Sequence, residues 1–218
     1  IEASMAYVED KSTRPLRELI KGRPITPERK GAIAQLLGLQ LLRGPATFQQ
    51  RDEILRPTLE GIEAKDMRPK HLASAGGDVD LARSEVVDTI LGPTNRFVMM
   101  LQYVPKIASI MALMRWHVLR FDGPVLAYSD HPVVLWPMYL EQAEPFVRQG
   151  LGPLTTREVR VPIAPHVAIL MNWIDRKDES DVRIDPSAAL EINAFTISQA
   201  QDQWMHQPKS EPEIGKGI

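Results

Sequence analysis

The hydrophobic period of the chain changes near Trp116, and this change limits the fold more than any other feature of the sequence. Before it, apolar residues recur at intervals of three and four, as on one face of a helix. From Trp116 to about Trp173 they alternate or form short runs rich in β-branched and aromatic residues, which is typical of strands. Helices followed by strands, without regular alternation of the two, predict an α+β fold.

Start and stop signals divide the first part into several helices. Thr26-Pro27-Glu28 provides a cap, a first-turn proline and a first-turn acid, and Gly44-Pro45 ends the helix that follows. The expected helices are Ile1–Asp10, Thr13–Ile20, Pro27–Arg43, Phe48–Ala64, Asp78–Leu91 and Asn95–Arg115. Asp66–Gly77 is expected to be a loop, and Pro105 to kink or break the last helix.

The second part predicts a small, mostly antiparallel sheet and a closing helix. The expected strands are Trp116–Phe121, Val125–Tyr128, Val133–Trp136, Arg157–Ile163 and Val167–Trp173. A turn at Asp122-Gly123 should pair the first two strands as a hairpin, and a turn at Pro165-His166 the last two. No strand is expected outside this region. The remaining expectations are a short helix at Glu141–Gln149, a charged loop at Asp175–Asp185 and a final helix at Ala188–Trp204.

Length and composition fit one folded domain. The chain has 218 residues, of which 44% are hydrophobic, which is enough for one full core. We expect a single α+β domain over residues 1–206 and a flexible tail over residues 207–218, which contain Pro, Gly and Lys. Residue 1 is Ile and opens directly into a helical pattern, so we expect an N-terminal segment to be missing.

A polar turn, Ser129-Asp130-His131-Pro132, separates two apolar runs. Turn residues such as Asp often accept a hydrogen bond from the amide two positions later, but here that position is Pro132, which has no N–H. Ser129 can still accept from the amide of His131. Asp130 needs another partner: the amide of Val133, a cation, a metal or water. It is a turn carboxylate held by a nearby Arg, a site carboxylate, or a carboxylate simply exposed to solvent.

Further candidates for a site lie outside this turn. The cation expected beside Asp130 is Arg43, with Arg115 or Arg120 next. Arg43 ends an apolar helix, where it either suits the helix dipole or binds an anion, and Gln40 can share its face.

Asn193 stands inside the final helix among apolar residues, so it either bonds the backbone or contacts a ligand. His131 is the best candidate for a general acid or base, because it follows a carboxylate in a turn. His117 and His166 are expected to be packed and hydrogen-bonded, and His206 to be solvated.

Several classes of chemistry lack their sequence patterns. The chain has no cysteine, so thiolate nucleophiles, disulfides and cysteine-based zinc sites are excluded, and a reducing, cytoplasmic location fits. We find no phosphate-binding loop, no H-E-x-x-H and no G-x-S-x-G, and no two histidines are spaced three or four apart. No metal site is therefore expected, and the cofactor stays unknown.

Charge and hydropathy limit the partners. The net charge of −2 gives no basic field for nucleic acid, and the tryptophans are not interleaved with basic runs. No apolar run approaches the roughly 20 residues that a membrane helix needs. An unknown small or polar ligand and a protein partner stay open.

Four stretches, in order along the chain, resemble an uncharacterised, mainly bacterial family, domain of unknown function 4238. Q-L-L-R-G-P is similar to its Q-x-x-R-T-P element, and R-W-H-V-L-R-F followed by Y-S-D-H-P-V resembles its T-S-D-N-P-V element. R-E-V-R-V-P-I-A-P-H is similar to its strand ending P-L-S-P, and I-N-A-F-T-I-S-Q-A to its closing N-x-x-x-x-x-x-A helix. The chain departs from the pattern at Gly44, at His131 and in lacking the opening H-Y-V-P segment. The resemblance implies a cytoplasmic bacterial protein with an α+β fold and supplies no reaction.

These observations lead to three hypotheses. The first is a non-catalytic binding or regulatory module with a polar cluster around Asp130. The second is a hydrolase-like enzyme with Asp130 as base or metal ligand, His131 as its helper and Arg43 as an anion clamp, while Gln40, Ser129 and Asn193 bind substrate. The third is a subunit of a larger complex.

Overall fold

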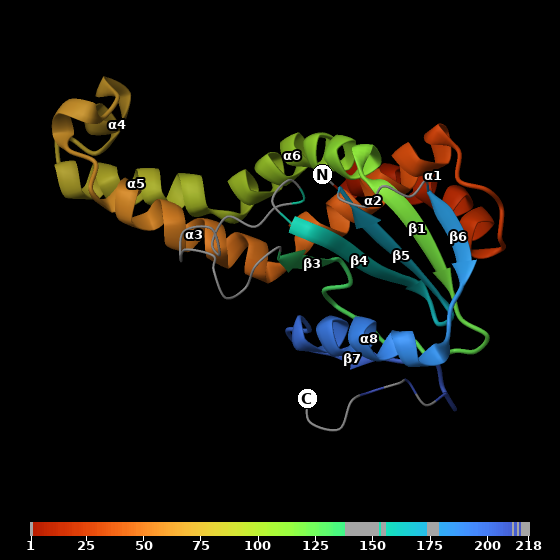
Figure 1. Cartoon of the computed structure of the whole chain (residues 1–218). Helices are drawn as coiled ribbons and strands as arrows, with labels where there is room; N and C mark the ends of the chain where they lie inside the picture. Colours follow the sequence, from red (N-terminus) through yellow and green to blue (C-terminus); the bar gives the residue numbers. More distant parts are fainter. Residues whose placement is uncertain are drawn as a thin grey trace. The chain divides into compact units, whose positions relative to one another are not determined.

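A computed structural model describes residues 2–137, 153, 156–173, 179–210, 212 and 214 (Figure 1). Helices come first, then a small sheet, then a helix, so the predicted α+β class is confirmed. The chain divides into two compact units, and both boundaries lie inside helices. Unit 1 is Leu42–Tyr103, and unit 2 consists of Glu2–Leu41 and the described residues from Val104 onward. The single domain over residues 1–206 stays a prediction.

The secondary-structure elements of unit 1 are all helical. Its elements are α3 (Pro45–Glu60), the 3-10 turn η1 (Ala64–Asp66), α4 (Pro69–Ser74) and α5 (Val79–Leu91), with the ends of α2 (Pro27–Arg43) and α6 (Pro93–Leu113). Leu59 of α3 packs with Val87 and Leu91 of α5. A second cluster joins Met67, Ala75 and Ala82, so α4 and the loop before it are anchored on α5. The expected loop at Asp66–Gly77 therefore contains a helix, because its apolar residues have this core to pack on.

Unit 2 is built on a five-stranded sheet in the order β3-β4-β5-β1-β6. The strands are β1 (Arg115–Arg120), β3 (Val134–Pro137), β4 (Thr156–Ala164), β5 (Val167–Asn172) and β6 (Ser180–Arg183). The neighbouring pairs are antiparallel except β1 and β6, which run parallel. The predicted hairpin around Pro165-His166 is confirmed as β4 and β5. A separate two-stranded ladder joins β2 (Tyr128–Ser129) to β7 (Trp204–Met205).

The two faces of the sheet pack against different helices (Figure 1). Alternate side chains of β1, β4 and β5, such as Trp116, Val159 and Ile169, form the main core with α1 (Glu2–Ile20), α2 and the end of α6. The opposite face carries Ala168, which packs with Ile192 of α8 (Ala189–Ser198). A 3-10 turn, η2 (Pro186–Ala188), precedes α8. This alternation is the period of two found in the sequence.

Prolines do not interrupt two helices where the sequence predicted a break. α1 runs unbroken through Pro15. The buried hydroxyl of Ser12 lies 2.7 Å from each of the carbonyl oxygens of Val8 and Ala32, between which its one proton is shared, and it fixes the middle of α1 beside α2. α6 also continues through Pro105, so no break occurs there. Ala108 and Met111 of α6 lie in the main core, and packing of this kind outweighs the lost backbone hydrogen bond.

The strand pairing near Phe121 differs from the pairing predicted from the sequence. The predicted hairpin of Trp116–Phe121 with Val125–Tyr128 is wrong. The amide of Phe121 donates to the carbonyl oxygen of His166, and the amide of Leu126 donates to the carbonyl oxygen of Pro165, each over 3.0 Å. β1 instead pairs with β5 and β6.

Two further strands, β6 and β7, lie beyond Trp173, where none was expected. The closing helix ends at Ser198 instead of Trp204, because the chain turns there to pair with β2.

Some expectations lie outside the described residues, including the helix at Glu141–Gln149 and most of the tail. Among the described helices, none combines the length and the apolar character that crossing a bilayer requires.

Candidate functional site

The polar turn begins at a buried serine. Ser129 is the last residue of β2 and is fully buried. Its hydroxyl oxygen accepts a hydrogen bond from the amide of His131 over 3.2 Å, as the sequence predicted. The hydroxyl therefore stabilises the turn and does not face solvent.

Asp130 binds backbone amides from a distant part of the chain. Its two carboxylate oxygens accept from Gln201 N at 3.1 Å and Asp202 N at 2.8 Å. Its own amide donates to the carbonyl oxygen of Gln203 over 3.2 Å. The hydrogen bond from the Asp202 amide, aided by those at Gln201 and Gln203, holds the pKa of Asp130 below its usual value.

The prediction that Asp130 contacts a cationic side chain is therefore wrong for the part of the chain that the structure describes. Pro132 removes the local amide, as argued from the sequence, but the donors that replace it are main-chain amides and not an arginine. Arg120, one of the expected cations, instead pairs with Asp181 through Nε and Nη2.

These contacts lengthen the β2–β7 ladder by one more residue. Tyr128 faces Met205 and Ser129 faces Trp204 in antiparallel register. A two-residue ladder is marginal by itself. Since the Asp130 bonds continue it at one end, the carboxylate fixes the segment that carries Met205.

Asn193 of α8 likewise fixes the segment before β2 through hydrogen bonds to its main chain. It is fully buried. Its Oδ1 accepts from the amide of Ala127 and its Nδ2 donates to the carbonyl oxygen of Val125, both over 2.8 Å. Of the two possibilities left open by the sequence, the backbone-bonding one is realised. The Asn193 side chain thus makes hydrogen bonds to Val125 and Ala127 of the kind that a neighbouring strand would make.

His131 is buried next to Asp130. It is 8% exposed, and its Nε2 has no hydrogen-bond partner. Burial lowers the pKa of His131 because the charged ring would lose its hydration, and the charge of Asp130 opposes this only in part. The neutral ring is therefore favoured, and this position restricts access to any substrate.

The remaining predicted residues lie on α2. Arg43 is its exposed last residue and belongs to unit 1, whereas the half-buried Gln40 belongs to unit 2 with the polar turn. Their roles stay predictions. Of the other histidines, His117 is buried and bonds Ser180, as expected for a packed residue, whereas His166 is exposed, which corrects the expectation.

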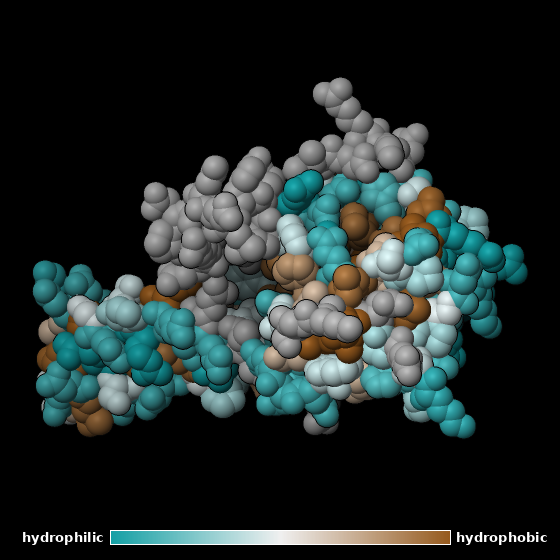
Figure 2. All heavy atoms as spheres, turned by 60° about the horizontal axis from the view of Figure 1, so that its bottom comes forward, coloured by the Kyte–Doolittle hydropathy of each residue, from teal (hydrophilic) through white to brown (hydrophobic). Residues whose placement is uncertain are grey.

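A pocket of about 410 Å³ lies in unit 2 between the segments that Asp130 and Asn193 hold. One wall is Leu126–Tyr128, a second is Pro162–Pro165 at the β4–β5 turn, and a third is Met205–Pro208. The lining is mainly apolar, and Tyr128, His206 and Gln207 add polar groups. On the side of unit 2 that carries α8 and β7, hydrophobic side chains reach the surface among hydrophilic ones (Figure 2). We call this cavity the ladder pocket.

An arginine on the sheet face beside α8, Arg160, is held by two carboxylates and an aromatic ring. The guanidinium of Arg160 lies 4.3 Å from the ring centroid of Trp136. Its Nε and Nη2 donate to Oε2 of Glu158 over 3.0 and 2.7 Å, and its Nη1 lies 3.2 Å from Oε2 of Glu191. The Trp136 ring meets Phe195 edge-on. Two carboxylates and a ring neutralise and cover this cation, so it joins the sheet to α8 and is not available to a ligand.

Sequence reasoning missed the pocket-lining residues because their proximity depends on the β2–β7 pairing, which hydrophobic period does not reveal. The one available signal was the run Pro162–Pro165, whose prolines end a strand at a rigid turn. Among the described residues, no group of three or more His, Asp or Glu side chains is arranged to hold a metal ion.

Comparison with known proteins assigns a family. The model of a family described as protein of unknown function (DUF4238) matches residues 1–210, so the chain belongs to this family. The chain matches no curated protein and no solved structure.

Proposed function

We propose that this member of the DUF4238 family is a non-catalytic binding module whose ladder pocket holds the apolar group of a small ligand. One observation carries the proposal. The side-chain oxygens of Asp130 and Asn193, two polar residues predicted from the sequence, accept hydrogen bonds from main-chain amides. The chain segments that these hydrogen bonds fix form walls of the pocket.

The chemistry of the pocket supports an apolar ligand. A volume of about 410 Å³ is within the range of roughly 300–1,000 Å³ of small-molecule sites. Three prolines restrict the backbone of the lining, so little conformational entropy is lost when a ligand binds. Tyr128 and His206 at the pocket can orient a polar group of the ligand.

The alternative is a hydrolase-like enzyme that uses Asp130, His131 and Arg43. The buried, unpartnered Nε2 of His131 is the observation in its favour. Against it, both Asp130 oxygens already accept amides, and a base must reach the proton that it removes. A regulatory role or a place in a larger complex is compatible with the same pocket. The bacterial and cytoplasmic setting is proposed from the family resemblance and the absence of cysteine.

Methyl NMR with a neutral aromatic probe, indole, tests the proposal. Ala127, Ala164 and Met205 line the pocket, so ¹³C-methyl labels on Ala and Met report its occupancy. We expect these three methyl signals to shift in a saturable way. Unchanged signals at millimolar indole would contradict the proposal.

A matched pair of variants then locates the effect. Met205→Gln makes one wall polar at nearly constant size and should weaken indole binding about tenfold, as expected when about 1.4 kcal/mol of apolar contact is lost. Leu190→Gln makes the same kind of change on α8, outside the pocket, and should leave binding unchanged. Equal losses in both variants would show that indole binds elsewhere.

A further inference from the structure

Unit 1 contains a second pocket, of about 390 Å³, that is unrelated to the ladder pocket. Its apolar lining comes from Ile62, Met67, Val86 and Ile90. Met67 is buried, while the other three are half-buried, so an apolar floor is open to a ligand. We call this cavity the helical pocket.

The edge of the helical pocket is basic. Arg68, Lys70 and His71 line it, together with one carboxylate, Asp66, and the hydroxyl-bearing Thr89. The lining therefore contains two basic side chains, Arg68 and Lys70, against one carboxylate.

The two cations are set apart by having no acidic partner. Among the Arg and Lys side chains that the structure describes in unit 1, Arg68 and Lys70 alone have no hydrogen bond or ion pair. The partnered cations are Arg43, Arg51, Arg56, Lys65, Arg83 and Arg96. Lys65, which is close in sequence, pairs with Glu63 at 2.7 Å. The two unpaired cations are thus both at the pocket.

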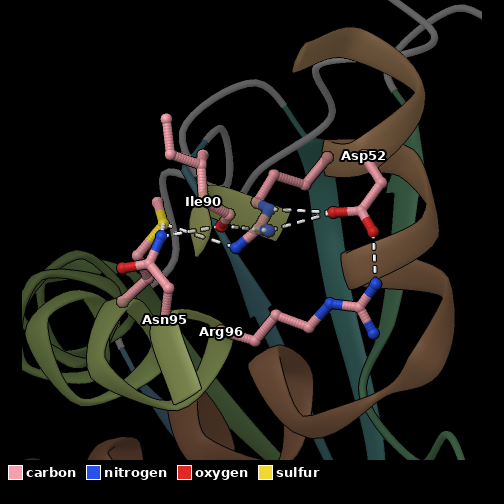
Figure 3. A network of polar contacts seen from close by, with 6 residues as sticks. Asp52, Ile90, Asn95 and Arg96 are labelled. Carbon is pink, nitrogen blue, oxygen red and sulfur yellow. Dashed lines mark hydrogen bonds and ion pairs between the residues drawn. The ribbon is translucent and has the colours of Figure 1, made fainter. Parts of the chain in front are cut away.

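A polar network fixes the floor of the pocket at the end of α5. The carbonyl oxygen of Ile90 accepts from Nη2 of Arg51 at 3.1 Å and from Nδ2 of Asn95 at 2.7 Å (Figure 3). Asp52 lies between Arg51 and Arg96 and pairs with both. This network holds Ile90 in place before any ligand arrives, which limits the reorganisation that binding requires.

We propose that the helical pocket binds a small ligand with an apolar body and a carboxylate head. The body lies on Met67, Val86 and Ile90, and the carboxylate lies between Arg68 and Lys70. Unpaired cations beside an apolar floor complement such an anion and disfavour a cation of the same shape.

Octanoate tests this proposal, with 1-octanol and octylammonium as probes of equal chain length. The methyl signal of Met67 reports the helical pocket, and that of Met205 reports the ladder pocket, so the two sites are read separately. Octanoate should shift Met67 in a saturable way and bind at least about threefold more tightly than octanol, since exposed ion pairs are weak. Octylammonium should bind least well. Equal affinities of octanoate and octanol at Met67 would overturn the proposal.

Charge-removing variants identify the head-group contacts. Arg68 and Lys70 are exposed, so Arg68→Gln with Lys70→Gln should leave the fold intact while weakening octanoate roughly threefold to tenfold. Octanol binding should not change. Lys65→Gln removes a nearby cation outside the pocket and should leave both probes unaffected. An unchanged octanoate affinity in the double variant, or an equal loss in Lys65→Gln, would overturn the proposal.

Discussion

Replacing Asn193 with alanine should destabilise unit 2 strongly, although the residue sits on a short helix near the end of the chain. Its side chain satisfies the buried amide of Ala127 and the carbonyl of Val125. In Asn193→Ala both groups lose their partner. A stranded buried amide costs about 1–3 kcal/mol, and a carbonyl that water can partly reach costs about 0.5–1.5 kcal/mol. The expected loss of unfolding free energy is therefore about 1.5–4.5 kcal/mol.

Tryptophan fluorescence during urea unfolding measures this loss. All four tryptophans, at positions 116, 136, 173 and 204, lie in unit 2, so their emission follows that unit. For a chain of this length the loss corresponds to a decrease in Tm of roughly 3–18 °C.

The matched control is Ser198→Ala at the exposed end of the same helix, where the hydroxyl bonds a carbonyl within that helix. It should change the free energy of unfolding by less than about 0.5 kcal/mol. If Asn193→Ala lost no more than this control, Asn193 would not hold the pocket wall.

Three further predictions follow from the structure. The main-chain bonds that lower the pKa of Asp130 stabilise the fold above about pH 4 and lose this effect as the pH falls through the lowered pKa. Wild type and Asp130→Asn should therefore differ in urea midpoint at pH 7, and the difference should shrink as the pH falls below about 4. Because burial lowers the pKa of His131, the folded state resists protonation, and wild type should lose stability as the pH falls below about 6.5 toward the folded-state pKa. His131→Gln should flatten this part of the pH profile, and an equal slope in both proteins would refute the assignment. In α2, a Cβ at Gly38 would lie 3.3 Å from the carbonyl oxygen of Val104, whereas Gly31 has open space, so Gly38→Leu should lower the unfolding free energy by about 1–3 kcal/mol and Gly31→Ala raise it by about 0.5–1 kcal/mol.

The helical part of the fold could be predicted from the sequence because its signals are local. The Thr26-Pro27 start and the Gly44-Pro45 end bound α2 as expected, and the change of period at Trp116 coincides with the start of β1. Pro15 misled the prediction, because a proline signal is local and the burial of Ser12 is not.

Strand pairing could be predicted only where the chain turns back directly. The Pro165-His166 turn gives β4 and β5, but the stronger-looking Asp122-Gly123 signal does not make a hairpin. Alternation shows which side chains share a face, and it does not show which strand lies beside which.

The polar turn was interpreted correctly in part. The missing amide of Pro132 does force Asp130 to find partners elsewhere, but the chemistry of a single turn cannot show that they are the amides of Gln201 and Asp202. The pocket itself depends on this long-range pairing. No local pattern therefore indicated that Met205 would lie opposite Tyr128.

A crystal structure of the chain with bound indole is the most direct test of the central claim that Asp130 and Asn193 frame a binding pocket and do not act on the ligand. The account predicts the indole ring between Leu126–Tyr128 and Met205–Pro208, with Asp130 still bonded to the amides of Gln201 and Asp202. Indole bound directly to the Asp130 carboxylate or to the Asn193 side chain, with those main-chain bonds broken, would contradict it.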